Sequence, residues 1–190
     1  MRPQEFSMSR LNLVDASHAT LKPIKEKLGA NLPPPVRVLA NSPAAMSAFF
    51  ALHGTLGQGQ LTPRVREQIA LAVGNAQGCR YCVSHHTQLG RKTGLSDQEL
   101  DQARSGKAPD AKVEAALQFS RQIAARRGAV TDAELAAVRA AGWNDGDVVE
   151  ILAQVVATTF GNYLNHLAQT EIDIPPVDLV PAAVIDGIHA

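Results

Sequence analysis

Apolar residues recur at spacings of three and four along most of the chain, which is the period of an amphipathic helix. Runs of Val and Ile with strict alternation, bounded by turn residues as in half-buried strands, are absent from the sequence. The pattern therefore predicts an all-α protein. The expected helices cover residues 43–55, 63–76, 80–92, 97–105, 110–127, 132–141 and 145–170, with a further short helix near residues 19–28.

Local signals mark the ends of these helices. A hydroxyl side chain followed by proline begins two of them, because the hydroxyl can cap the first turn and proline lacks the N–H that would be unpaired there. Two more begin with a capping box, and three end at a glycine, which accepts positive φ at little cost. The residues concerned are Ser42-Pro43, Thr62-Pro63, Ser96 with Glu99, Thr131 with Glu134, and Gly94, Gly128 and Gly142.

Proline-rich segments flank the helical part of the chain. Residues 1–40 contain Pro23 and the run Pro33 to Pro35, and we expect them to form an extended N-terminal arm. Residues 41–171 form the expected helical domain. Residues 172–190 also contain prolines, but they are too apolar for a solvated tail, so this C-terminal arm should pack on its own or a neighbouring subunit.

Composition narrows the classes of partner. The chain has 190 residues, 45% of them hydrophobic, and 18 basic residues balance 18 acidic ones. A formal net charge of zero argues against nucleic acid and against a polybasic membrane anchor. No apolar run approaches the roughly 18 residues of a membrane span, and the first residues lack the apolar stretch of a leader peptide. We therefore expect a cytoplasmic protein that binds neither nucleic acid nor membrane.

The two cysteines of the chain, Cys79 and Cys82, lie three residues apart at the start of an expected helix. Two cysteines cannot build the disulfide framework of a secreted domain, so redox or metal chemistry is the better hypothesis. At about 100° per residue, Cys82 lies about 60° and His86 about 20° from the direction of Cys79. Unpaired N–H groups at a helix start also favour a thiolate. The geometry is that of a redox-active pair.

Glu67 adds a carboxylate to this arrangement. Its face of helix 63–76 carries Ala70, Leu71 and Gly74, so the carboxylate should be at least partly buried, which would raise its pKa. A turn at Gly78 would fold the two helices into a hairpin and bring Glu67 beside His86. Carboxylate, imidazole and thiol would then lie in series, which is the general arrangement for activating a nucleophile.

Glu67, eleven further residues, Cys79-Arg-Tyr-Cys82, three further residues and His86 form a spacing that resembles the signature of AhpD-like alkylhydroperoxidases in the carboxymuconolactone decarboxylase superfamily. The resemblance is specific across residues 62–94. It extends more loosely from Trp143 to Glu171, which is similar to the closing helix of the peroxidase-related branch. The best-known members carry a histidine where this chain has Tyr81.

The resemblance implies an all-α, AhpD-like helical bundle that assembles into trimers or hexamers and reduces organic hydroperoxides. It implies no cofactor other than a redox-active Cys79–Cys82 disulfide. Cys82 would attack the peroxide and become a sulfenic acid, and Cys79 would resolve it to the disulfide. Glu67 and His86 would relay protons, and a dithiol or a protein reductant would reopen the disulfide.

Physical reasoning and the resemblance differ about which thiol attacks. The first cysteine at a helix start usually gains more from the helix dipole, which favours Cys79. The resemblance favours Cys82, which has His86 four residues later, and we take Cys82 as the nucleophile.

Two other interpretations of the cysteine pair remain open. One is half of a zinc site, completed by a residue such as His53 or His166. The other is a pair of inert buried thiols. The alternatives for function are a thiol–disulfide carrier that feeds a separate peroxidase, a lactone enzyme of the decarboxylase type, and a binding or assembly module without chemistry.

Residues around the motif have simpler interpretations. We expect His85 at the surface or in an interface, and Tyr81 in a pocket wall with its hydroxyl bonded. His166, flanked by Asn162 and Asn165 on an otherwise apolar helix, is expected to be a hydrogen-bonded core histidine, and the alternative is a place in the lining of the pocket or of a subunit interface. Met46, Phe49 and Phe50 form an apolar stripe of the core or of an interface.

Overall fold

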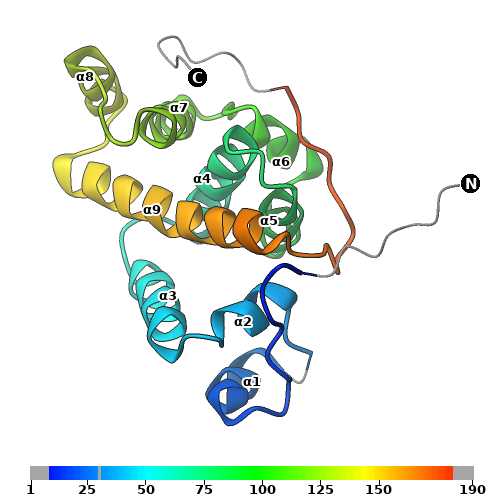
Figure 1. Cartoon of the computed structure of the whole chain (residues 1–190). Coiled ribbons are helices and arrows are strands. Elements are labelled where there is room, and N and C mark those ends of the chain that lie inside the picture. Colours follow the sequence, from blue (N-terminus) through cyan, green and yellow to red (C-terminus); the bar gives the residue numbers. More distant parts are fainter. Residues whose placement is uncertain (1–8, 30, 182–190) are drawn as a thin grey trace, which may run out of the picture.

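The computed structural model describes residues 9–29 and 31–181, and all the regular secondary structure of these residues is helical (Figure 1). This confirms the predicted all-α class. None of the described helices is long and apolar enough to cross a membrane. The elements are η1 (Ala19–Leu21), α1 (Lys22–Leu28), α2 (Pro34–Leu39), α3 (Pro43–Leu56), α4 (Pro63–Ala76), α5 (Arg80–Lys92), α6 (Asp97–Arg104), α7 (Ala111–Arg126), α8 (Asp132–Ala140) and α9 (Asp145–Ala168).

The predicted helix ends are confirmed by their hydrogen bonds. Ser42 and Thr62 each accept the backbone N–H of the residue three positions later. Both expected capping boxes, at the starts of α6 and α8, are formed in full. The three glycines expected at helix ends, Gly94, Gly128 and Gly142, have φ of +86°, +89° and +94°. A side chain at these positions would be strained.

The prediction of an extended segment through the triple proline is wrong. Pro34 begins α2 and Pro35 follows it in the first turn, with Pro33 immediately before the helix. The first-turn N–H groups of a helix have no partner within the helix, so two prolines there cost no hydrogen bond. The helix then buries Val36, Val38 and Leu39. These apolar side chains stabilise a helix that the prolines alone did not indicate.

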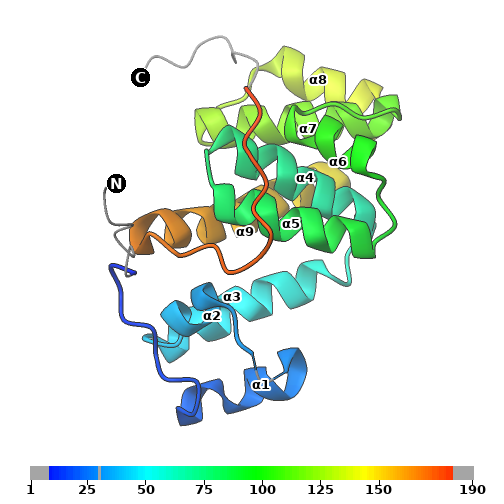
Figure 2. The ribbon, with the colours of Figure 1, turned by 90° about the vertical axis from the view of Figure 1, so that its right-hand side faces the viewer.

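Helix α4 lies at the centre of the bundle, packed against α5, α6, α7 and α9 (Figures 1 and 2). Its apolar residues are almost completely buried, as are the partners they meet on α7 and α9. The centre of this core comprises Ile69, Leu71, Ala72, Val73, Val83, Leu117 and Ile151. A second cluster joins α2 and α3 to α9 and contains Met46, with Phe49 and Phe50 packed against it, which confirms the expected apolar stripe. The α4–α5 pair is therefore held on a rigid support.

Residues 171–181, here called the C-terminal strap, run without helix from the end of α9 across α5 and towards α4 and α6 (Figure 2). The backbone N–H of Val177 donates to Ser84 Oγ at 2.9 Å, and Asn75 bonds both the N–H and the carbonyl of Val180. Arg80 pairs with Asp178 at 2.7 Å. These contacts place the strap over the first turns of α5, where both cysteines lie.

Candidate active site

A tight hairpin between α4 and α5 positions the two cysteines. Gly78, with φ of +71°, reverses the chain after α4, and the Cys79 N–H donates to the Gly74 carbonyl at 2.9 Å. Cys79 is the N-cap of α5, and its Sγ accepts the backbone N–H of Cys82 at 3.3 Å. Both cysteines are free thiols, with only 2% and 5% of their surface exposed. A sulfur thus occupies the place where a helix start prefers an anion.

The same hairpin brings Glu67 of α4 beside His86 of α5. Glu67 Oε2 lies 2.8 Å from His86 Nδ1, and the two side chains are only 18% and 17% exposed. The carboxylate is therefore largely buried, as its apolar neighbours in the sequence indicated. A carboxylate bonded to Nδ1 fixes the orientation of the ring and leaves Nε2 as the nitrogen that exchanges protons. This is the geometry required of an oriented base.

The two thiols interact strongly with each other and differ in acidity. The pKa of Cys79 is lowered, chiefly because Cys82 donates hydrogen bonds to its sulfur from its thiol and its backbone N–H, and further by His86. The pKa of Cys82 is raised, by its hydrogen bond to Cys79 and by burial. Coupled groups of this kind titrate as a unit. The pair therefore loses one proton readily, and the resulting negative charge is more stable on Cys79 than on Cys82.

Asn165 of α9 contacts the thiol pair, and sequence analysis assigned it no role there. Its Nδ2 donates to Cys82 Sγ at 3.2 Å, and Asn165 itself is 8% exposed. A hydrogen bond from Asn165 contributes to the lowered pKa of Cys79 and partly opposes the effects that raise the pKa of Cys82. The only indication in the sequence was a polar residue on an apolar helix. The sequence does not predict that this helix crosses the cysteine hairpin.

Three other histidines, His53, His85 and His166, lie near the site. His85 is half-buried, and burial lowers its pKa to about 4, so it is neutral at pH 7. Burial likewise lowers the pKa of His53 on α3. His166 is exposed, with Nε2 at 3.0 Å from the Gln77 carbonyl, so it is not a core histidine. It lines a cavity beside Cys79, which agrees with the alternative prediction for this residue. Within the described residues, no three His, Cys, Asp or Glu side chains are arranged to hold a metal ion, and the zinc interpretation gains no support.

A cavity of about 270 Å³ lies beside the thiols, between the start of α5, the end of α9 and the strap. Cys79, Asn165 and Ile172 contribute to its lining. Tyr81 also lines it, and its hydroxyl donates to Asp173 Oδ1 at 3.1 Å, so the expected pocket-wall role is confirmed. Of the two cysteines only Cys79 lines this cavity, so it is the space through which a small molecule can approach the Cys79 sulfur.

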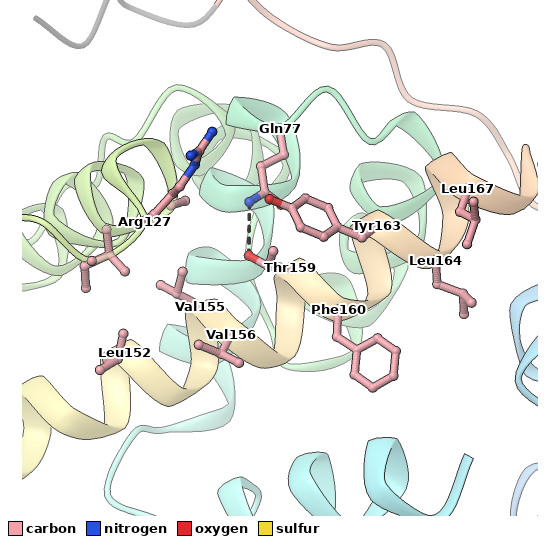
Figure 3. Close-up of a pocket in the computed structure, with 13 residues that line it drawn as sticks. Gln77, Arg127, Leu152, Val155, Val156, Thr159, Phe160, Tyr163, Leu164 and Leu167 are labelled. Atoms are coloured by element: carbon pink, nitrogen blue, oxygen red, sulfur yellow. Dashed lines mark hydrogen bonds between the residues drawn. The ribbon is translucent and has the colours of Figure 1, made fainter. Parts of the chain in front are cut away.

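A larger cavity, of about 650 Å³, opens between α9, the end of α7 and the end of α4 (Figure 3). Its wall is mostly apolar and includes Leu152, Val156 and Tyr163, while Gln77 donates to Thr159 Oγ1 at 3.0 Å inside it. Among the residues that the structure describes, no cysteine, histidine or carboxylate lines this cavity. Size alone does not make an active site, so we assign the candidate site to the smaller cavity beside the thiols.

Comparison with known proteins shows which family part of the chain matches and which solved structures share the fold. Residues 43–125 match the model of the carboxymuconolactone decarboxylase family, and this range includes Glu67, Cys79, Cys82 and His86. The crystal structure of an alkylhydroperoxidase AhpD core, an uncharacterized peroxidase-related protein from Ralstonia eutropha JMP134, is 26% identical and superimposes with a TM-score of 0.75 over 87% of this chain and 93% of that chain. Together, these two matches support the AhpD/carboxymuconolactone decarboxylase superfamily for this chain. The resemblance of the cysteine motif to this superfamily is thereby confirmed.

Other AhpD-like structures share the fold at lower identity. A peroxidase-related protein from Silicibacter sp. TM1040 is 22% identical, with a TM-score of 0.73 over 93% of this chain and 95% of that chain. A cysteine-to-alanine variant of the debrominase Bmp8, in complex with 2,3,4-tribromopyrrole, is 20% identical, with a TM-score of 0.72 over 87% of this chain and 94% of that chain. No protein of curated function is similar enough in sequence to count as a match.

Proposed function

We propose that this AhpD-like protein is a thiol-dependent peroxidase that reduces organic hydroperoxides through the Cys79–Cys82 pair. The observation that carries the proposal is the combination of two hydrogen-bonded, buried thiols at a helix start with a Glu67–His86 pair joined at 2.8 Å. The first supplies a thiolate and the second a positioned proton carrier. The family match, with a peroxidase-related neighbour at 26% identity, supports the same activity.

The chemistry balances with no bound cofactor. The Cys82 thiolate attacks the terminal oxygen of the hydroperoxide, so an S–O bond forms, the O–O bond breaks, and the alkoxide leaves as an alcohol after taking a proton. The Cys79 thiolate then attacks the sulfenic sulfur, and water leaves as the disulfide forms. A dithiol or a protein reductant returns two electrons and two protons to the pair.

The acidity of the pair is compatible with attack by Cys82. Because the two sulfur atoms share a hydrogen bond, a thiolate on Cys79 can accept the proton of the Cys82 thiol and leave the charge on Cys82. Cys79 then carries the proton that it must lose before resolving the sulfenic acid. The lower pKa of Cys79 thus suits a resolving thiol that also serves as the first proton acceptor.

Burial of the thiols favours a small substrate over a protein partner. With 2% and 5% of their surface exposed, neither Cys79 nor Cys82 can meet the disulfide of another protein unless the strap moves. A hydroperoxide has to pass only through the adjacent cavity. A protein reductant of the Cys79–Cys82 disulfide would need the same movement of the strap, so burial favours a small dithiol as the reductant and does not by itself distinguish a peroxidase from a thiol–disulfide carrier. A lactone enzyme of the decarboxylase type would have no need of the hydrogen-bonded thiols.

The deciding experiment is to count thiols in the folded, reduced protein before and after one equivalent of cumene hydroperoxide, with intact mass. Loss of both thiols together, with the mass of two hydrogen atoms, supports the peroxidase. Persistence of both thiols contradicts it. Tribromopyrrole and lactone substrates, run in parallel, test the activities suggested by the debrominase fold neighbour and by the family name.

A further inference from the structure

Asn165 lies where the last helix crosses the cysteine hairpin. It comes from α9, 83 residues after Cys82, and its Nδ2 donates to Cys82 Sγ at 3.2 Å. The Oδ1 atom of the same amide is also buried, but within the described part of the chain it has no hydrogen-bond partner. An unpartnered acceptor of this kind costs free energy, so it needs an explanation.

The position of Asn165 is well fixed. The residue is 8% exposed, and its backbone carbonyl accepts the backbone N–H of Thr170 at 3.1 Å where α9 ends. Asn165 also lines the cavity of about 270 Å³ that reaches Cys79. One face of the amide therefore meets the sulfur of Cys82, while the residue borders the space open to a small substrate.

We propose that Asn165 is a catalytic residue whose amide N–H holds the negative charge on Cys82 and whose free Oδ1 accepts the O–H of the hydroperoxide. This assignment rests on the proposed function, in which Cys82 is the nucleophile. A side-chain amide offers a donor and an acceptor on two atoms of the same carbon. It therefore contacts the attacking sulfur and the attacked oxygen together and brings them into line.

The same contact explains how Cys82 can be the nucleophile although Cys79 occupies the helix start. The dipole of α5 and the Cys82 N–H draw the charge towards Cys79. The Asn165 N–H is a donor from outside the hairpin that acts on Cys82 Sγ. Once the proton has moved to Cys79, this donor stabilises the thiolate on Cys82, where the S–O bond forms.

The test uses the Cys79→Ser protein, in which Cys82 is the only thiol and the introduced serine can still cap α5. The rate of alkylation of Cys82 by iodoacetamide is measured against pH with and without Asn165→Ala. Loss of a hydrogen bond to a charged group should slow alkylation at pH 7 about tenfold and move its inflection about one pH unit upwards. Asn165→Asp, which keeps the shape and removes the donor, should act in the same direction.

The matched control is Gln154→Ala, which removes another buried amide of α9 that is bonded to Thr158 and not to a thiol. Its alkylation profile should equal that of the Cys79→Ser parent. Circular dichroism establishes that each variant is folded. An unchanged alkylation profile in a folded Asn165→Ala or Asn165→Asp protein overturns the role of the N–H group.

The role of Oδ1 is tested by trapping the sulfenic acid formed on Cys82 with cumene hydroperoxide. Asn165→Ala should slow this reaction by about tenfold more than it slows alkylation, because only the hydroperoxide has an O–H to donate. Equal slowing of the two reactions overturns the role of Oδ1. If the parent forms no sulfenic acid at all, the proposed function and the role of Oδ1 both fail, while alkylation still decides whether Asn165 stabilises the Cys82 thiolate.

Discussion

Asn75 forms two hydrogen bonds with the backbone of Val180, a residue 105 positions later. Its Nδ2 donates to the Val180 carbonyl at 3.0 Å, and its Oδ1 accepts the Val180 N–H at 2.9 Å. The amide thus replaces the strand partner that this extended segment lacks. Ile172 of the same strap packs against Cys79, Tyr81 and Cys82, so the strap covers one side of the thiols.

Asn75→Ala should loosen the strap and expose the cysteines. Losing two hydrogen bonds to one segment should favour its open state by about 1–3 kcal/mol, so alkylation of the two thiols should be about 5- to 150-fold faster. The measurement is the rate of thiol alkylation at fixed pH. Asn41→Ala is the control, because Asn41 also bonds the backbone of a remote segment, at Asn12, but lies far from the strap. Equal alkylation rates in wild type and Asn75→Ala would show that the strap does not limit access.

The two cysteines should fail in different ways when replaced. Cys82→Ser should abolish hydroperoxide turnover, because it removes the attacking sulfur. Cys79→Ser should still allow Cys82 to reach the sulfenic acid, but with no resolving thiol an excess of hydroperoxide should drive it to the sulfinic acid. Intact mass distinguishes one added oxygen from two. Over-oxidation in Cys82→Ser instead would exchange the two roles.

The Glu67–His86 pair should matter most near neutral pH. Glu67→Gln and His86→Ala should each slow hydroperoxide turnover about a hundredfold while the fold persists, because they remove a positioned proton carrier. Glu99→Gln is a suitable control, since Glu99 pairs with Arg64 at 2.6 Å away from the thiols. If both site variants turn over at the wild-type rate, the pair is structural.

The stability of the fold should fall in mild acid through the buried histidine His85. Burial lowers its folded pKa to about 4, so the neutral ring contributes stability that is fully present above about pH 6.5 and is lost as pH falls towards 4. Between pH 7.5 and pH 5 the loss is about 2 kcal/mol. Urea unfolding at pH 7.5 and pH 5 measures it, and His85→Gln should reduce the difference. An equally steep loss in His85→Gln would assign it to other groups.

The exposed face of α9 should mediate assembly into a homo-oligomer. Four large apolar residues lie on it at helical spacings, Leu152, Val156, Tyr163 and Leu167, with 41% to 62% of their surface exposed. Such an apolar face is unusual for a monomer. Sedimentation should give a multiple of 20.2 kDa, and Val156→Glu with Leu167→Glu should lower the mass. A wild-type monomer at micromolar concentration would contradict this prediction. The resemblance implies a trimer or a hexamer, so these are the two masses to look for first.

The sequence alone determined the features that depend on neighbouring residues. Helix starts at Ser42 and Thr62 were predictable because a hydroxyl cap acts within one turn. The closeness of Cys79 and Cys82 was predictable as well, because the two lie within one turn of the helix start. The backbone of Cys79 is extended at the N-cap position, so the helical angle does not place its side chain relative to His86. Glu67 could be placed beside His86 because a short hairpin leaves two helices only one way to pair.

Tertiary structure decided what depends on distant residues. The contact of Asn165 with Cys82 and the strap held by Asn75 join positions 83 and 105 residues apart, and no local pattern records such a pairing. The prolines of α2 form a helix only because Val36 and Leu39 find a buried partner surface. The sequence thus determined which chemical groups the site contains. Packing decided which sulfur receives a hydrogen bond, how deeply both are buried and what covers them, because burial and long-range hydrogen bonds exist only once the chain has folded.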